Sequence, residues 1–296
     1  MTTLNEKFAK AMINDAIADL DISKNLKAMA SSNPQNSYFI NRRRLFFLEQ
    51  AEEKSVKSVI IIYALFTTFM PLFSIILRDL DSSQSSIDAN SIEILTNRSL
   101  RRLKTFVKMS YKDFTHNPLN KMDIINILED EYIILSNMGI EREHTQVILD
   151  DCAILKRENS LEQLLTEIGN RKTRDLDYRK RWAIGLEELS KNLKYGDDGK
   201  PKMDASIANK LFKAFIIPLG IYPISFMSLH LSLLKYLSTY VSASRYPPLN
   251  GEDLTEPLSK LDQIQEVVEE SINSFSGIDF GMLEKADLRQ LEQLDI

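Results

Sequence analysis

Two long stretches of this chain contain no charged side chain: Ser58–Leu77 and Ala214–Leu234. An α-helix rises about 1.5 Å per residue, so each stretch is long enough to cross the roughly 30 Å hydrocarbon core of a bilayer. This predicts an all-α protein with a helical domain and two long apolar helices embedded in a membrane. The alternative is a large soluble helical bundle that buries both helices on all sides. The basic residues that bracket the stretches are Lys57 and Arg78 for the first, and Lys213 and Lys235 for the second.

The two stretches differ in how regular a helix they allow. The first contains one proline, Pro71, and no glycine. We expect Pro71 to kink a membrane helix without ending it. The second contains Pro218, Gly220 and Pro223, so it is expected to be transmembrane, broken or re-entrant. It also contains His230. Ionisable groups inside a membrane are usually functional, so His230 is a candidate pore-lining or proton-sensing residue. In a bundle core it would be a hydrogen-bonded core histidine.

The distribution of basic residues conflicts with two simple membrane crossings. Residues 41–57 contain five Lys or Arg and residues 78–94 contain one, which places the N-terminal side in the cytoplasm. Residues 197–213 contain four and residues 235–251 contain two, which places the central region in the cytoplasm as well. Two crossings cannot satisfy both assignments. Three arrangements resolve the conflict. The first stretch sets the orientation and the central region crosses, or one stretch does not span, with the second as the candidate, or neither spans, as in the bundle alternative.

A basic and aromatic stretch precedes the first apolar stretch by two to three helical turns. Arg42, Arg43 and Arg44 lie beside Phe46 and Phe47, a composition suited to the headgroup region, where guanidinium groups face lipid phosphate. The alternative is an ordinary amphipathic helix with a solvated basic face. The same interfacial role is predicted for Lys57, Lys213 and Lys235.

Apolar spacing predicts helices throughout the chain. A helix is expected over residues 4–29, a turn over 31–37, and one long helix that runs from Tyr38 into the first apolar stretch. Further helices are expected over Glu141–Lys156 and after Ser160. That last helix should begin with a capping pair of Ser160 and Gln163 and end at Gly169.

The C-terminal region is predicted to hold a helix at about 255–275, with a continuous apolar stripe, and a short helix at 282–293. We expect the stripe to bind a protein partner or a second copy of the chain. The expected organisation is N-terminal amphipathic helices at 1–57, apolar segment 1 at 58–77, a central helical domain at 78–213, apolar segment 2 at 214–241 and C-terminal amphipathic helices at 242–296.

The chain lacks the motifs of common catalytic sites, so we expect a protein that is not an enzyme and uses no cofactor. His144 lies near Glu141 and Glu143, with Asp151 two turns on, which makes a weak metal-site hypothesis. A solvated histidine on a charged helix face is the more frequent case. The only cysteine, Cys152, is expected to be a small core residue.

The net charge of -5 argues against a general nucleic-acid-binding role. Basic clusters near Arg171 and Arg179 are expected to be solvated or paired with carboxylates. The expected function is that of a membrane-associated helical protein that perturbs, gates or permeates a bilayer in response to a partner. The alternative is an all-helical protein–protein interaction scaffold. The corresponding locations are a membrane, with the helical domain in the cytoplasm, or the cytoplasm alone.

Overall fold

The computed structural model describes residues 4–81, 125–126, 128–129, 132–133, 135–136, 142–171, 222–240 and 253–276. For 4–9, 60–81, 143–144, 222–227 and 275–276 it describes the helix only. All regular structure in these residues is helical, and they contain no strand, which confirms the all-α class. A helix at 161–171 follows α5. The other elements are α1 (Leu4–Ser32), η1 (Pro34–Asn36), α2 (Ser37–Asp81), α5 (Arg142–Lys156), α8 (Tyr222–Ser238), α10 (Thr255–Ser259) and α11 (Leu261–Ser276).

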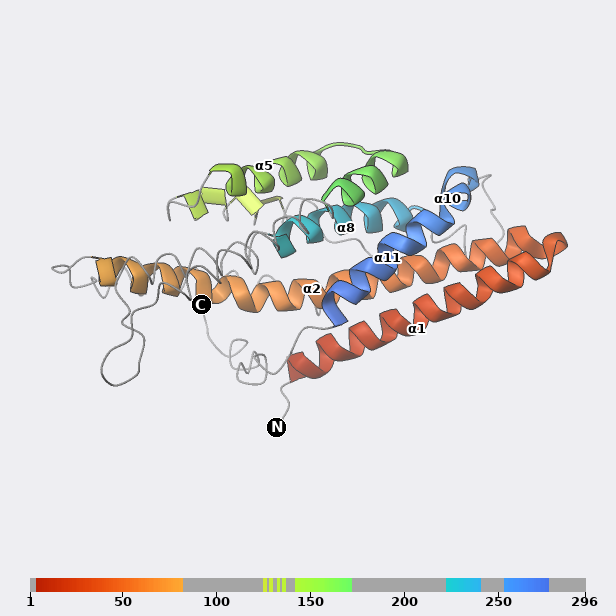
Figure 1. Ribbon diagram of the computed structural model, residues 1–296, viewed down its shortest axis with the longest axis horizontal. Helices are drawn as coiled ribbons and strands as arrows, with labels where there is room; N and C mark the ends of the chain where they lie inside the picture. The colour runs from red at the N-terminus through yellow and green to blue at the C-terminus, as the bar shows by residue number, and fades with distance from the viewer. Residues whose placement is uncertain are drawn as a thin grey trace, which may run out of the picture.

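Helices α1 and α2 form a long antiparallel hairpin, and α11 lies across both (Figure 1). The turn predicted over 31–37 is confirmed as the short helix η1. The Asn33 backbone N–H donates to the Met29 carbonyl at 3.0 Å, and Ser37 Oγ donates to the Pro34 carbonyl at 2.9 Å. These bonds satisfy polar backbone groups at the two helix ends, which would otherwise have no intrahelical partner.

Helix α2 is the central element of the fold. It contains 45 residues, so it is about 67 Å long. The single helix predicted from Tyr38 into the first apolar stretch is therefore confirmed. The helix continues past Pro71 to Asp81. Its N-terminal half carries Leu45 and Leu48, which are 1% and 0% exposed, so this half lies inside the protein.

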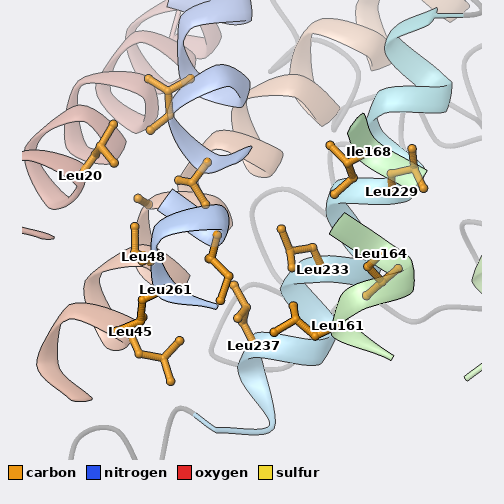
Figure 2. Close-up of a cluster of buried hydrophobic side chains, with 14 of the residues drawn as sticks. Leu20, Leu45, Leu48, Leu161, Leu164, Ile168, Leu229, Leu233, Leu237 and Leu261 are labelled. Atoms are coloured by element: carbon orange, nitrogen blue, oxygen red, sulfur yellow. The ribbon is translucent and has the colours of Figure 1, made fainter. Parts of the chain in front are cut away.

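One hydrophobic core joins helices from distant parts of the sequence (Figure 2). Both the N-terminal and the C-terminal described helices contribute side chains to this core. The main contributors are Ala16 and Leu20 of α1; Leu45 and Leu48 of α2; Leu161, Leu164 and Ile168; Leu229, Leu233 and Leu237 of α8; and Leu261, Ile264, Val268 and Ile272 of α11.

The described part of the second apolar segment is a helix of this core. Helix α8 begins at Tyr222, so Pro223 lies in the first turn, where the missing N–H breaks no helical hydrogen bond. Leu234 is 5% exposed and the leucines around it are also buried by protein. The described part of this segment is therefore covered by protein side chains. Lys213, Ala214, Pro218 and Gly220 lie outside the described residues.

No helix among the described residues combines the length and the apolarity that crossing a membrane requires. Most of the leucine side chains described within 10–59 and 228–240 are buried against other helices of the chain, whereas Ile22, Met29, Tyr38 and Phe39 are exposed.

One predicted helix start is confirmed, and two other boundaries differ from the prediction. The capping pair at the confirmed start is present, because the Gln163 N–H donates to Ser160 Oγ at 3.3 Å and the Ser160 N–H donates to Gln163 Oε1 at 3.1 Å. The predicted end at Gly169 was wrong: the helix continues to Arg171, because that side chain is buried and paired. The helix predicted at about 255–275 is divided at Lys260 into α10 and α11, and the short helix predicted at 282–293 lies outside the described residues.

We predict that Leu48→Ala lowers the free energy of unfolding by about 2–5 kcal/mol, because it removes a fully buried side chain and leaves a cavity. Urea denaturation followed by circular dichroism measures this loss. Ile133→Ala is the control, since Ile133 is 51% exposed and its change should stay within about 0.5 kcal/mol. Equal losses for the two variants would contradict the core described above.

Candidate functional site

Polar and charged side chains are buried along the N-terminal half of α2. A buried charge is costly unless it is paired or hydrogen-bonded, so each of these groups identifies a position where a specific partner is required. The buried polar residues of α2 are Arg42, Arg44, Glu49, Glu52, Ser55, Lys57 and Ser58.

Three side chains in one short stretch of α2 form hydrogen bonds or ion pairs with three different helices. Successive residues in a helix are rotated by about 100°, so Glu52 and Ser55 lie on the same face, about 60° apart, and Lys54 is directed to another side of the helix. Each of the three side chains meets a different neighbouring helix. We call this set the polar clamp: Glu52–His230 of α8 at 2.5 Å, Lys54–Asp19 of α1 at 2.5 Å and Ser55–Ser271 of α11 at 2.7 Å.

The Glu52–His230 contact is the most deeply buried part of the polar clamp. Glu52 Oε1 lies 2.5 Å from His230 Nδ1, and the two side chains are 0% and 1% exposed. Glu52 Oε2 has no hydrogen-bond partner among the described residues. The structure thus places His230 against a carboxylate inside the protein. Its predicted pore-lining or proton-sensing role stays a prediction.

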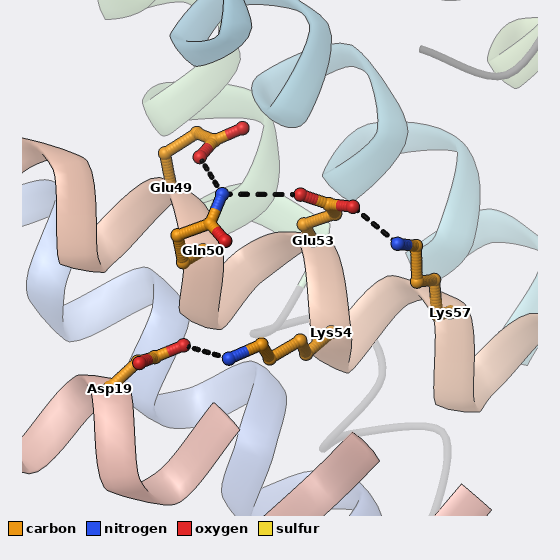
Figure 3. Close-up of polar contacts among 6 residues, drawn as sticks. All are labelled: Asp19, Glu49, Gln50, Glu53, Lys54 and Lys57. Carbon is orange, nitrogen blue, oxygen red and sulfur yellow. Dashed lines mark hydrogen bonds and ion pairs between the residues drawn. The ribbon is translucent and has the colours of Figure 1, made fainter. Parts of the chain in front are cut away.

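A second group of polar contacts runs along the surface of α2 beside the clamp (Figure 3). Gln50 Nε2 donates to Glu49 Oε2 at 2.7 Å and to Glu53 Oε2 at 3.3 Å. Glu53 also pairs with Lys57 one turn later. The Lys57 side chain is only 10% exposed, so it is bonded within the chain and is not on an outer surface.

The arginines predicted to face lipid are divided between the interior and the surface. Arg44 is buried, and its Nη2 donates to Asp262 Oδ1 at 2.5 Å and to Gln265 Oε1 at 2.8 Å. Arg42 is also buried, with its guanidinium 5.9 Å from the centre of the Tyr38 ring. Of the three arginines, Arg43 alone is exposed.

The remaining members of the predicted interfacial set also vary in their positions. Phe46 and Phe47 are partly buried, and their rings meet edge-on at 5.2 Å. Lys235 is exposed on α8. The apolar residues that are exposed near Arg43 are instead Tyr38 and Phe39, which the sequence analysis did not single out.

The salt bridge to Arg44 changes the acidity of Asp262. The hydrogen bond from Arg44 is the largest cause that holds the pKa of the Asp262 carboxyl below its ordinary value of 3.8, and partial burial opposes it. Lys27 Nζ adds to the effect from 3.1 Å. The carboxylate form is therefore favoured where α11 meets the α1–α2 hairpin.

A separate buried ion pair lies between α5 and the helix at 161–171. Arg171 Nη2 donates to Asp151 Oδ1 at 2.6 Å, and the two side chains are 8% and 0% exposed. Arg171 was expected to be solvated or paired, and it is paired. Asp151 was a member of the weak metal-site hypothesis, and its contact with Arg171 assigns it a structural partner. The side chain of His144 lies outside the described residues.

Cys152 is the buried core residue that the sequence predicted. It is 4% exposed and forms no disulfide. Burial is the main cause that raises the pKa of the Cys152 thiol to about 11, and the nearby Glu129 carboxylate adds to it. The thiol form dominates at neutral pH, so this group is a poor nucleophile.

Polar contacts of the described residues join helices to one another. No group of three or more His, Cys, Asp or Glu in the described part of the chain is arranged to hold a metal ion. The Glu52–His230 pair is an acid and a base in contact, but at 0% and 1% exposure no substrate reaches it while α2 and α8 stay packed. These contacts fix the α1–α2 hairpin relative to α8 and α11.

The sequence analysis did not identify Glu52, Lys54 or Ser55 as important. The sequence does contain a signal for Glu52 and Ser55. A core face of α2 recurs every three or four residues, at Leu45, Leu48, Glu52, Ser55 and Val59. Polar residues at two of these positions require partners inside the protein. The sequence alone does not identify those partners, because His230 is 178 residues away from Glu52.

No protein-family model, no curated protein and no solved structure matches this chain.

We predict that His230→Leu destabilises the protein by about 3–5 kcal/mol, because it leaves the buried Glu52 carboxylate without this contact. The double variant Glu52→Leu with His230→Leu should regain most of the loss, since no buried charge then remains at the site. Chemical denaturation of the two single variants and the double variant forms a double-mutant cycle. Strictly additive losses would show that the two side chains do not interact.

We predict that Asp262→Asn destabilises the wild-type protein at pH 6 and has a smaller effect in acid. The pKa of Asp262 is lowered in the folded state, so its stabilising contribution is present above the ordinary value of 3.8 and is lost as pH falls through the lower, folded value. Denaturation curves between pH 3 and pH 6 measure the difference between the wild type and the variant. The exposed Asp21→Asn is the control for loss of one charge. A difference that grows in acid would contradict the Arg44–Asp262 pairing.

Proposed function

We propose that this chain is a non-enzymatic, membrane-associated helical protein that perturbs, gates or permeates a bilayer in response to a partner. The observation that carries the proposal is the composition of α2. Its first half is held in a helical bundle by the polar clamp, and the same unbroken helix continues into a run of twenty residues, Ser58–Leu77, without a charge.

An uncharged helix of this length needs apolar cover around its whole circumference. A bilayer provides such cover, and a helix anchored at one end by ion pairs would hold the bundle at the membrane surface. The proposal concerns association with the bilayer and includes no number of crossings.

The polar contacts of the described residues support a non-catalytic role. Glu52, Lys54 and Ser55 contact α8, α1 and α11, and each contact holds two helices together. A protein of this kind would act by changing the arrangement of its helices.

A protein–protein interaction scaffold is the second candidate. The burial of α8 inside the protein favours it. The leucines of α8, within the second apolar segment, are covered by the chain's own helices. The α11 stripe expected to bind a partner also lies in this core, with Ile264 and Val268 both 0% exposed. A scaffold would therefore have to use another surface.

Fractionation of the expressed full-length chain tests the proposal. We expect the wild type to stay in the membrane pellet through a carbonate wash and to be released by detergent. Leu65→Lys with Phe69→Lys, one turn apart within the uncharged run, should move the protein to the supernatant, because each charge is costly in an apolar environment. The matched control is Thr166→Lys with Asn170→Lys, one turn apart on the exposed side of the helix at 161–171.

Recovery of the wild type in the carbonate supernatant as a monodisperse particle would overturn membrane association and favour the scaffold. If the protein does remain in the pellet, ion flux from reconstituted liposomes tests the second part of the proposal. Absence of flux under every oligomeric or partner condition would leave association without permeation.

A further inference from the structure

Three large apolar side chains are exposed at the end of the α1–α2 hairpin, on both sides of the turn. Met29, Tyr38 and Phe39 are 54%, 48% and 62% exposed. Met29 lies near the end of α1, and Tyr38 and Phe39 lie at the start of α2, on either side of the short helix η1 where the chain reverses. We call these three residues and the exposed Arg43 the hairpin tip. Exposed apolar groups that cluster in this way mark a binding surface.

The sequence around the hairpin tip is one-sided in charge. Residues 22–48 contain five Lys or Arg and no Asp or Glu, although the whole chain has a net charge of -5. Lys24, Lys27 and Arg44 contact carboxylates of α11, at distances of 2.6, 3.1 and 2.5 Å. Arg43 is exposed and lies one helical turn after Phe39 in α2. The hairpin tip thus combines apolar groups and positive charge.

The hairpin tip is convex and its rings are held in place. Figure 1 shows the end of the hairpin extending past α10 and α11, so no described helix covers it. The Tyr38 and Phe39 rings meet edge-on at 5.6 Å, and the Arg42 guanidinium lies 5.9 Å from the centre of the Tyr38 ring. Little side-chain entropy is then lost when the rings are buried by a partner.

We propose that the hairpin tip docks on an anionic lipid surface, with Met29, Tyr38 and Phe39 in the interfacial region and Arg43 against lipid phosphate. Aromatic side chains favour the headgroup level of a bilayer, and basic residues favour anionic lipids. A protruding tip without acidic residues fits a flat anionic surface better than it fits a pocket on a protein. This inference rests on the proposed membrane association but uses residues outside the uncharged run of α2.

Sedimentation of the full-length chain with phosphatidylcholine vesicles, with and without phosphatidylglycerol, tests the proposal. The wild type should bind the anionic vesicles more tightly. Tyr38→Ser with Phe39→Ser should weaken binding to anionic vesicles about tenfold or more, since two partly apolar rings no longer enter the interface. Arg43→Glu should weaken it about fivefold or more and should leave binding to pure phosphatidylcholine unchanged.

Two substitutions of similar type serve as controls. Ile133→Ser removes an exposed apolar side chain elsewhere, and Arg142→Glu reverses an exposed charge at the start of α5. Both should bind as the wild type does. Circular dichroism should give unchanged helix content for every variant, because all five altered tip and control sites are exposed.

The outcomes separate the two proposals. If the wild type and the tip variants bind both kinds of vesicle equally, the role of the hairpin tip is overturned and membrane association stands. If none of them binds either vesicle, both proposals are overturned. A tip that recognises an acidic protein surface instead would leave vesicle binding insensitive to these substitutions, which also overturns the lipid assignment.

Discussion

The fold depends on how Glu52, Lys54 and Ser55 attach α2 to three other helices. Apolar packing alone permits two helices to slide along each other by a turn, because leucine faces at successive turns are similar. A buried hydrogen bond or ion pair does not tolerate such a shift, since the displaced groups would lose their partners in a low-dielectric interior. The polar clamp therefore selects one register for α1, α8 and α11 along α2, while the leucine core provides most of the favourable burial.

This division also explains why buried charges are found in a core otherwise made of leucine. A buried pair such as Glu52 and His230 contributes little net stability, because desolvation opposes the attraction between the groups. Removal of one member is nevertheless costly, so the pair penalises every arrangement in which α8 and α2 are not aligned. The same reasoning applies to Asp151 and Arg171, which align α5 with the helix that follows it.

Local features of this fold could be read from the sequence. The long helix from Tyr38, the turn before it and the Ser160–Gln163 capping pair depend on neighbours within a few residues, and all are confirmed. The end at Gly169 was predicted wrongly because a tertiary contact of Arg171 outweighs the local preference for glycine as a stop signal.

The setting of the second apolar segment could not be read in the same way. A leucine-rich helix is equally apolar whether lipid or protein surrounds it, and the difference depends on helices distant in sequence. The same is true of the polar clamp, because composition identifies a buried glutamate as needing a partner without naming the histidine that meets it. Which side chains are exposed at the hairpin tip also depends on which sides of α1 and α2 the other helices cover.

The position of α11 in the core has a consequence for the order in which a ribosome can build this protein. Ser55 meets Ser271 and Lys24 meets Glu269, contacts that span 216 and 245 residues. The N-terminal hairpin therefore leaves the ribosome long before the helix that covers it. At about 5–20 residues per second, the roughly 200 intervening residues take on the order of 10–40 s to synthesise. During that interval the leucine face of α2 has no α11 to cover it, so the nascent chain must be shielded by another surface, such as a chaperone or a bilayer.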